Sequence, residues 1–318
     1  MSGPRVINLV GGRGYTGSEL LRLIARHPGM DLGLASSRGE AGELLTTACP
    51  QWPEDGRTFT QLEPQDVSAN PADAWVLALP NGAAGPWVEA IRANFPGSVI
   101  LDLSADYRFD PDWTYGLPER YRDDIRNAHL IANPGCYATG AQLGLLPLVD
   151  QLAADPLVFG ISGYSGAGKT PSPRNDPELL KDNLIPYALS GHMHEKEISH
   201  QLHVAVRFMP HVAAFFRGIS LTIAFELDHP ASADEQLRVF SAAYAGEERV
   251  LVSREIPQIS AIRDTADIHI GGFDIDARNP AQGSLVVVLD NLLKGAASQA
   301  MQNLNLALGL DENSGIIP

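Results

Sequence analysis

Hydrophobic positions in the first part of the chain follow a repeating order, in which short apolar runs alternate with stretches of helical periodicity. The first run, Val6 to Val10, ends in a glycine cluster, and apolar residues at helical spacing follow as far as Ile24. Four further apolar runs are expected to form strands: 31–35, 75–79, 99–103 and 130–132. Strands that alternate with helices in this way predict a parallel α/β sheet.

The pattern changes in the second part of the chain, where longer apolar runs occur. Strands are expected at 157–162, 218–227, 250–253, 267–271 and 284–289. Few helical stretches separate the last three, which predicts a mixed or antiparallel sheet in a second domain. An apolar-periodic segment from Leu292 to Leu308 predicts a final helix that returns to the first domain. We therefore place the first domain at 1–137 together with 292–318, and the second at 138–291.

Length and charge narrow the functional classes. A chain of 318 residues that is 44% hydrophobic accommodates two domains of ordinary size. Its formal charge of −15 argues against nucleic-acid and membrane-surface partners, because both are polyanionic. An anionic ligand would need a local site, built from backbone N–H groups and a few Arg or Lys residues.

Cysteine usage and the N-terminal segment indicate a compartment. The two cysteines, Cys49 and Cys136, are too few for a disulfide framework, and no metal-binding C-x-x-C pair occurs. Met1 to Arg5 lead into the first strand without a visible signal peptide, and no apolar run is long enough to span a bilayer. We expect a reduced, soluble, cytoplasmic protein.

Glycines between the first strand and the first helix predict a dinucleotide site. Gly11, Gly14 and Gly17 form G-x-x-G-x-x-G, which includes Tyr15 and Thr16. Such a turn lets the backbone approach a pyrophosphate, and the helix N-terminus supplies oriented N–H donors. The spacing differs from the commonest fingerprint, so the prediction depends on the strand-turn-helix context.

The end of the second strand indicates which dinucleotide binds. NAD enzymes usually place Asp or Glu there to hold the ribose hydroxyls, whereas this chain has Ser36, Ser37 and Arg38. Hydroxyl groups and a guanidinium would bind a 2′-phosphate through charge-assisted hydrogen bonds. We therefore expect NADPH/NADP rather than NADH, with Arg13 beside the turn as a further contact.

A lone cysteine occupies a position suited to covalent catalysis. Cys136 follows a short strand and Pro134-Gly135, and a run of helix-like residues follows it. The positive end of a helix dipole favours thiolate, which is the attacking form of a thiol. Cys49 lacks such a setting and is interpreted as structural.

Five segments that occur in order make the chain similar to a known family, N-acetyl-γ-glutamyl-phosphate reductase of arginine biosynthesis. The active-site signature of that family resembles the segment from Asn133 to Pro147. The other four resemblances lie at 14–21, 103–108, 162–168 and 290–297. The chain departs from the family pattern at Asn133 and Ala138 and is somewhat short.

The resemblance implies both a fold and a reaction. The fold is a Rossmann-like NADPH domain and an α+β domain with a mixed sheet for substrate and oligomer contacts, in a homodimer or homotetramer. The thiolate attacks a small acyl phosphate, phosphate leaves, and hydride from NADPH reduces the thioester to a semialdehyde. The matching motifs also suggest cofactor contacts from Ser165, Gly166 and Asn291.

Reduction of a thioester needs a proton donor, for which histidine is suited near neutral pH. The segment Gly191-His192-Met193-His194 resembles a family motif, and two histidines at i and i+2 cannot share a helix face. We expect His192 to be the acid/base because it follows a glycine, and His194 to contact substrate or support the loop. A metal is not expected, because no third ligand stands near the pair.

Three basic residues are candidates for binding the anionic groups of the substrate. Arg108 ends a strand of the first domain, where ligands gather in open α/β sheets. Lys169 follows the Ser165–Gly168 loop, and Arg217 precedes Gly218 in a motif that the family shares. The polar, proline-containing stretch 170–183 that follows Lys169 predicts a loop.

Four alternative functions remain open. Aspartate-semialdehyde dehydrogenase runs the same chemistry on aspartyl phosphate, but the His-Met-His and Gly-Cys-Tyr segments fit it less well. A reductase of carrier-linked aminoadipyl phosphate would share every motif. A Cys-His hydrolase would not need the glycine turn, and a non-catalytic NADPH-binding sensor would not need the thiol.

Overall fold

The computed structural model describes residues 3–316, and the expectations for Met1, Ser2, Ile317 and Pro318 lie outside them. The chain forms two compact units. One comprises the chain up to Gly135 and the segment that begins at Ala296, and the other runs from Cys136 to Gly295. The sequence places its two boundaries after residues 137 and 291.

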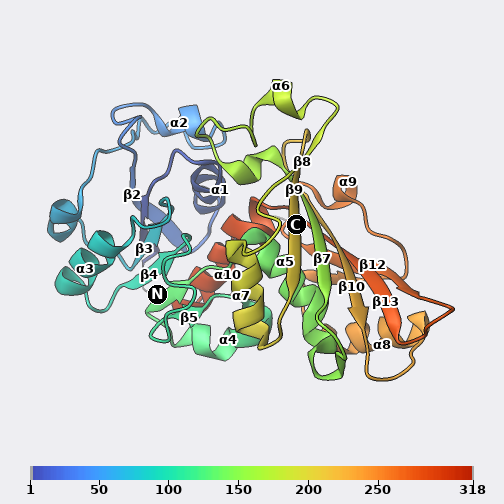
Figure 1. The fold of residues 1–318 in the computed structure, drawn as a ribbon. Coiled ribbons are helices and arrows are strands. Elements are labelled where there is room, and N and C mark those ends of the chain that lie inside the picture. Colours follow the sequence, from blue (N-terminus) through green and yellow to red (C-terminus); the bar gives the residue numbers. More distant parts are fainter. Residues whose placement is uncertain (1–2, 317–318) are drawn as a thin grey trace. The chain divides into compact units, whose positions relative to one another are not determined.

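The first unit is built on a parallel sheet with strands in the order β2-β1-β3-β4-β6-β5. Figure 1 labels β2, β3, β4 and β5 of this sheet. The strands are β1 Arg5–Val10, β2 Met30–Ser36, β3 Ala74–Leu77, β4 Val99–Asp102, β5 Thr114–Tyr115 and β6 Leu130–Ala132. The helices are α1 Tyr15–Ile24, α2 Leu45–Ala48, η1 Pro64–Ala69, α3 Gly85–Asn94, α4 Pro118–Arg126 and α10 Ser298–Ala307. Every residue of β3 and β4 is buried, as expected for central strands of a covered parallel sheet. The predicted parallel α/β sheet is confirmed.

The last helix belongs to the first unit, as the sequence predicts. A π-helical turn, η4 Leu293–Ala297, leads into α10, which contacts α1, α4 and β4. Gln299 and Asn303 on α10 each donate a side-chain hydrogen bond of 2.9 Å to the carbonyl of Gly116. These polar residues are buried, so their amides must find partners inside the protein.

The second unit is built on a mixed sheet in the order β11-β12-β13-β10-β7-β9-β8, which confirms the predicted mixed sheet. Its strands are β7 Leu157–Gly163, β8 Leu184–Pro186, β9 Arg207–Ala213, β10 Ile219–Glu226, β11 Val250–Val252, β12 Ile268–Ile275 and β13 Gln282–Leu289. Its helices are α5 Cys136–Leu145, η2 Leu146–Gln151, η3 Tyr164–Ala167, α6 Pro177–Leu180, α7 Met193–Leu202, α8 Ala233–Ala243 and α9 Ile259–Ile262. Two neighbouring pairs are parallel, β7 with β9 and β11 with β12, and the others are antiparallel.

Strand β9 was not predicted from the sequence, because Pro210 lies in its middle and proline usually argues against an internal strand. Pro210 pairs with Gly160 of β7 on one side, and on the other its carbonyl accepts the N–H of Tyr187.

Helix α5 lies close against this sheet because it presents two glycines at i and i+4. A Cβ added to Gly140 would lie 2.8 Å from Leu221, and one added to Gly144 would lie 2.6 Å from Ile223. Both distances are shorter than side chains tolerate, so the glycines set how near the helix approaches β10. This packing fixes how far from the sheet Cys136, the first residue of α5, is held.

Candidate active site

The predicted glycine turn connects β1 to α1 and is bound to the end of β2. The carbonyl of Ser36 accepts hydrogen bonds from the N–H groups of Gly11 and Gly12, at 3.1 and 2.9 Å. Gly11 has a φ of +86°, and a Cβ on it would lie 2.2 Å from the carbonyl oxygen of Ala78. Gly14 is the N-cap of α1 and supplies no side-chain cap. The turn therefore requires glycine for steric reasons, and it leaves the helix N-terminus uncapped, as an anion site requires.

The end of β2 carries features that fit a phosphate group. Ser36 and Ser37 are buried, and the Ser37 hydroxyl has no hydrogen-bond partner among residues 3–316. A buried hydroxyl without a partner is costly, so a ligand oxygen at this position would stabilise it. The Arg13 guanidinium lies beside the same loop, because a Cβ on Gly39 would be 3.6 Å from it.

Arg38 differs from these neighbours because it already has a partner. Its guanidinium forms a bidentate ion pair with Glu63, with Nε–Oε1 at 2.9 Å and Nη2–Oε2 at 2.6 Å. The Arg38 side chain is 75% exposed, so the pair is solvent-screened and weak. A 2′-phosphate that bound Arg38 would therefore have to compete with Glu63, a relation that the sequence did not reveal.

Cys136 begins α5, as predicted, and neither cysteine forms a disulfide. Its Cβ is so close to Gly295 that a Cβ on this glycine would lie 2.7 Å from it. Gly295 donates its N–H to the carbonyl of Asp290, which holds the glycine in place. The absence of a side chain at Gly295 thus makes room for the first carbons of Cys136, a role that was not predicted from the sequence. By contrast, burial raises the pKa of the Cys49 thiol.

The chain before Cys136 is held by buried polar contacts of the first unit. The Arg108 guanidinium donates from Nε to the carbonyl of Asn133 at 2.9 Å and from Nη2 to that of Leu103 at 3.0 Å. The Asn133 side-chain oxygen accepts from Asn303 Nδ2 at 3.0 Å. Arg108 was expected to bind substrate, and this stays a prediction. The contacts give it a positioning role, because they fix where the nucleophile segment leaves β6.

The two motif histidines lie at the start of α7, where His192 is the N-cap. Its Nδ1 accepts the N–H of His194 at 3.0 Å. Burial, with Arg174 nearby, lowers the pKa of His192, so its neutral form is favoured. Glu195 completes the turn by accepting the N–H groups of Gly191 and Phe208, at 2.8 and 2.9 Å.

An aromatic group, made of the rings of Tyr137, Tyr187, His192 and His194, joins these histidines to the cysteine segment. The His194 ring centroid lies 5.8 Å from that of Tyr137, the residue after Cys136, and 4.9 Å from that of His192. The Tyr137 hydroxyl donates to the carbonyl of His211 at 2.8 Å. The His192 ring lies 5.5 Å from that of Tyr187. The sequence pointed to Tyr137 only as part of the Gly-Cys-Tyr segment and not to Tyr187, because an aromatic residue alone gives no sign of what it contacts.

The pKa values of both tyrosines are raised. Burial is the largest cause in each case. For Tyr187, burial and the nearby Cys136, opposed by Arg174, together raise the pKa to about 12. Both phenols therefore stay protonated at neutral pH.

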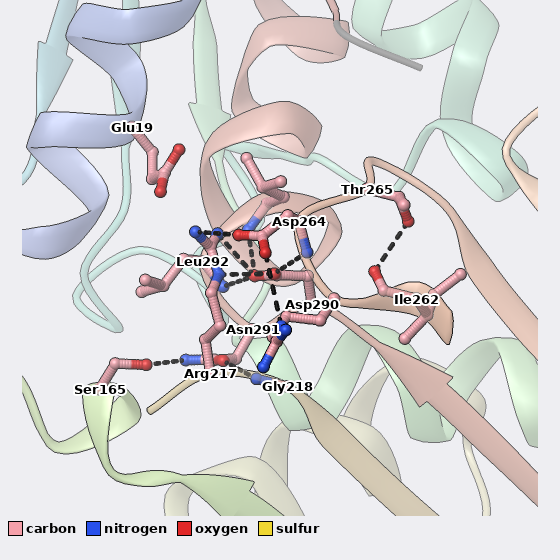
Figure 2. A network of polar contacts seen from close by, with 12 residues as sticks. Glu19, Ser165, Arg217, Gly218, Ile262, Asp264, Thr265, Asp290, Asn291 and Leu292 are labelled. Carbon is pink, nitrogen blue, oxygen red and sulfur yellow. Dashed lines mark hydrogen bonds and ion pairs between the residues drawn. The ribbon is translucent and has the colours of Figure 1, made fainter. Parts of the chain in front are cut away.

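Figure 2 shows a network of polar contacts around Asp290, in which Arg217 meets two carboxylates. Its Nε and Nη2 lie 2.6 and 2.9 Å from the two Asp290 oxygens, and its Nη1 lies 2.9 Å from Asp264. Asp264 has a φ of +67° and donates its N–H to Asp290 at 2.8 Å. Arg217 was proposed for substrate binding, which stays a prediction. This geometry favours a structural role, because two carboxylates already match its charge.

Asn291 lies beside this network and links two loops. Its side-chain oxygen accepts the N–H of Gly218 at 2.7 Å, and its Nδ2 donates to Ser165 Oγ at 2.9 Å. Cofactor contacts from Ser165, Gly166 and Asn291 stay predictions. The hydrogen bonds show that Asn291 holds the Ser165–Gly168 loop against the start of β10.

Replacement of Arg217 by methionine should destabilise the second unit strongly. The change leaves Asp290, which is 0% exposed, without its buried cation, and such losses cost about 3–5 kcal/mol. Urea unfolding of Arg217→Met measures the cost. Arg278→Met is the matched control, since its ion pair with Asp276 is on the surface, where solvent screening makes it contribute little to stability. Equal, small shifts for both variants would contradict the structural role.

The structure gives little evidence on the remaining sequence-based expectations, for Lys169, a metal site and a membrane span. Lys169 is exposed, and its assignment to substrate stays a prediction. Within residues 3–316, no group of three or more His, Cys, Asp and Glu is arranged to hold a metal ion. No helix in this part of the chain is long and apolar enough to cross a membrane.

Two family models match the chain. The semialdehyde dehydrogenase NAD-binding domain matches residues 6–128, and the semialdehyde dehydrogenase dimerisation domain matches residues 136–291. An N-acetyl-gamma-glutamyl-phosphate reductase from Xanthomonas campestris pv. campestris is 50% identical over 98% of this chain and 98% of its own. One from Stenotrophomonas maltophilia is 51% identical over 98% of this chain and 97% of its own.

Solved structures share the fold at lower identity. Aspartate semialdehyde dehydrogenase II from Vibrio cholerae has a TM-score of 0.78 at 19% identity, over 96% of this chain and 99% of its own. Aspartate semialdehyde dehydrogenase with NADP from Candida albicans has a TM-score of 0.73 at 16% identity, over 96% and 98%. These likenesses confirm the fold class.

Proposed function

Because the chain belongs to the N-acetyl-γ-glutamyl-phosphate reductase family, we propose that it reduces N-acetyl-γ-glutamyl phosphate to the 5-semialdehyde, in arginine biosynthesis. The observation that supports a covalent route is the placement of Cys136 at the start of α5, with Gly295 against its Cβ. A helix N-terminus favours the thiolate that such a route needs.

The proposed chemistry begins at Cys136. Its thiolate attacks the acyl carbon, the bond to the phosphate oxygen breaks, and inorganic phosphate leaves a thioester on the sulfur. NADPH supplies, when bound, the hydride that reduces this thioester. The oxygen of the resulting thiohemiacetal takes a proton from His194. The same imidazole takes the proton back when the carbon–sulfur bond breaks and the aldehyde leaves.

We assign proton transfer to His194 rather than to His192, which the sequence favoured. His192 uses Nδ1 to cap α7, and burial lowers its pKa, so its protonated form is scarce at neutral pH. His194 lies edge-on to Tyr137, the residue next to the nucleophile. We propose that His192 instead orients His194 through the hydrogen bond at the cap.

NADPH would be held by the glycine turn, the uncapped N-terminus of α1 and the loop after β2. The turn accommodates a pyrophosphate because only glycine fits beside Ala78. The buried Ser37 hydroxyl, with Arg38 next to it in the chain and Arg13 beside Gly39, fits a 2′-phosphate. The residues present therefore match NADP better than NAD.

Arg38→Asp should weaken NADPH binding by roughly tenfold to a hundredfold and NADH binding little. The variant replaces a charge-assisted contact to the 2′-phosphate by a repulsive one. Glu63→Gln should instead strengthen NADPH binding, because it frees Arg38 from its ion pair. Dissociation constants from cofactor fluorescence measure both effects. Arg126→Asp, which removes another surface ion pair, is the control. Equal losses for NADPH and NADH in Arg38→Asp would show that Arg38 does not touch the phosphate.

The proposed function is tested by NADP⁺ reduction in the presence of phosphate and N-acetylglutamate 5-semialdehyde. We expect turnover that requires phosphate. Aspartate semialdehyde and a carrier-linked aminoadipyl semialdehyde should be poor substrates in the same assay. Preference for one of these would favour the corresponding alternative reductase, and binding of NADPH without any turnover would favour a sensor.

We propose that the enzyme works in the cytoplasm as a homodimer or homotetramer. The match of residues 136–291 to a dimerisation-domain model supports self-association. Light scattering of the purified protein measures the assembly directly.

A further inference from the structure

The loop between η3 and β8 carries a cation that no motif singled out. Arg174 lies in this loop, with its guanidinium carbon 4.9 Å from the centre of the Tyr187 ring. Tyr187 in turn lies beside His192, and His192 beside His194. Arg174 thus belongs to the aromatic group that continues to Tyr137 and the cysteine segment.

The loop is braced rather than loose. Asn175, next to Arg174, accepts the N–H of Ser172 at 2.7 Å and donates to the carbonyls of Gly168 and Thr170, both at 2.8 Å. The short helix α6 that follows buries Leu180. These contacts limit the positions that Arg174 can adopt, which reduces the entropy lost on binding a ligand.

Tyr187 is also held in place. Its N–H donates to the carbonyl of Pro210 at 3.2 Å, and the preceding residues form β8, paired with β9. The next residue, Ala188, has a φ of +41°, one of four positive values among non-glycine residues in the described chain. Strained backbone of this kind persists where the surrounding structure demands it and clusters at binding sites.

The charge of Arg174 is not neutralised by the protein. Across residues 3–316 it forms no ion pair with a carboxylate, unlike Arg217, Arg249, Arg254, Arg263 and Arg278 of the same unit. It is exposed and so available to a ligand. In a chain of net charge −15, an unpaired guanidinium beside the aromatic group is a local attraction for an anion.

We propose that Arg174, positioned by Tyr187, binds the α-carboxylate of the acyl substrate. The inference rests on the proposed function, which supplies a substrate with both a carboxylate and a phosphoryl group. The phosphoryl group departs after the thiolate attack, whereas the carboxylate stays on the acyl chain through both half-reactions. An anchor that keeps the acyl carbon at Cys136 must therefore hold the carboxylate, which a planar guanidinium binds with two parallel hydrogen bonds.

Assays of the reverse reaction, in which the semialdehyde is oxidised, test the carboxylate and the phosphate independently. In that direction the semialdehyde carries the carboxylate, and phosphate is a separate substrate. Arg174→Gln should raise KM for N-acetylglutamate semialdehyde about 10- to 100-fold, the usual value of a hydrogen bond to a charged group. KM for phosphate, KM for NADP⁺ and kcat should stay within about threefold. Arg174→Lys should recover part of the loss, since it restores the charge without the paired donors.

Lys181→Gln is the matched control, because it removes one exposed cation from the same loop and should leave all constants unchanged. An unchanged KM for NADP⁺ in Arg174→Gln shows that the variant is folded. An unchanged KM for the semialdehyde, or a rise confined to KM for phosphate, overturns the inference while the proposed function stands. Absence of phosphate-dependent turnover in the unaltered enzyme overturns both.

Discussion

Cys136→Ser should lose turnover by a factor on the order of 10⁴ or more while binding NADPH with unchanged affinity. Serine has nearly the same shape, but its alkoxide is not available at neutral pH, so no acyl-enzyme forms at a useful rate. Removing the nucleophile of a covalent mechanism typically costs this much. Initial rates of NADP⁺ reduction, with phosphate and semialdehyde saturating, measure the loss.

The other cysteine provides the control for this experiment. Cys49 is 1% exposed, and burial raises the pKa of its thiol, so it stays protonated and unreactive. Cys49→Ala should keep kcat and lower stability by roughly 1 kcal/mol, as for a modest core truncation. Substantial activity in Cys136→Ser, or a loss in Cys49→Ala as large, would refute the assignment of the nucleophile.

His194→Asn should lower kcat by roughly 10²–10⁴-fold, the usual contribution of general acid–base catalysis. His192→Asn should lower it far less, because asparagine is a good N-cap residue and can still accept the N–H of His194. Steady-state rates with saturating substrate compare the two. If His192→Asn is the more damaging change, the proton comes from His192, as the sequence alone suggested.

The pH dependence gives a second reading of the same pair. The pKa of His192 is lowered from its ordinary value of 6.5. The stability that neutral His192 contributes as the N-cap of α7 is therefore fully present above pH 6.5, and it is lost as the pH falls through the lowered pKa. Protonation of Nδ1 removes the bond to the His194 N–H, so kcat should fall on the acid side. His192→Asn should weaken this acid limb. If the fall of kcat at acid pH is unchanged in His192→Asn, protonation of His192 is not its cause.

The elements and the nucleophile were predictable because their signals are local. The apolar runs that became β1, β7, β10 and β13 stand in the sequence as continuous segments. Cys136 could be placed at a helix start because Pro134-Gly135 and the apolar run after it are adjacent in the chain. Strand β9 was missed for an equally local reason, the central Pro210.

The partners of the polar residues were not predictable, because they lie far away in the chain. Arg217 and Asp290 are 73 residues apart, and Asn133 and Asn303 are 170 apart. A basic residue in a motif looks the same whether it meets a substrate or a buried carboxylate. The sequence therefore indicated which residue types carry the chemistry of the site. The structure was needed to tell residues that can contact a ligand from residues that hold other residues in place.

The central claim is that the acyl group passes through Cys136, and trapping the acyl-enzyme tests it most directly. The enzyme is mixed with N-acetyl-γ-glutamyl phosphate without NADPH, quenched in acid, digested and analysed by mass spectrometry. We predict one N-acetylglutamyl group on the peptide that contains Cys136, release of an equivalent amount of phosphate, and no adduct in Cys136→Ser. An unmodified Cys136 in enzyme that turns over, or an adduct on another residue, would contradict the account.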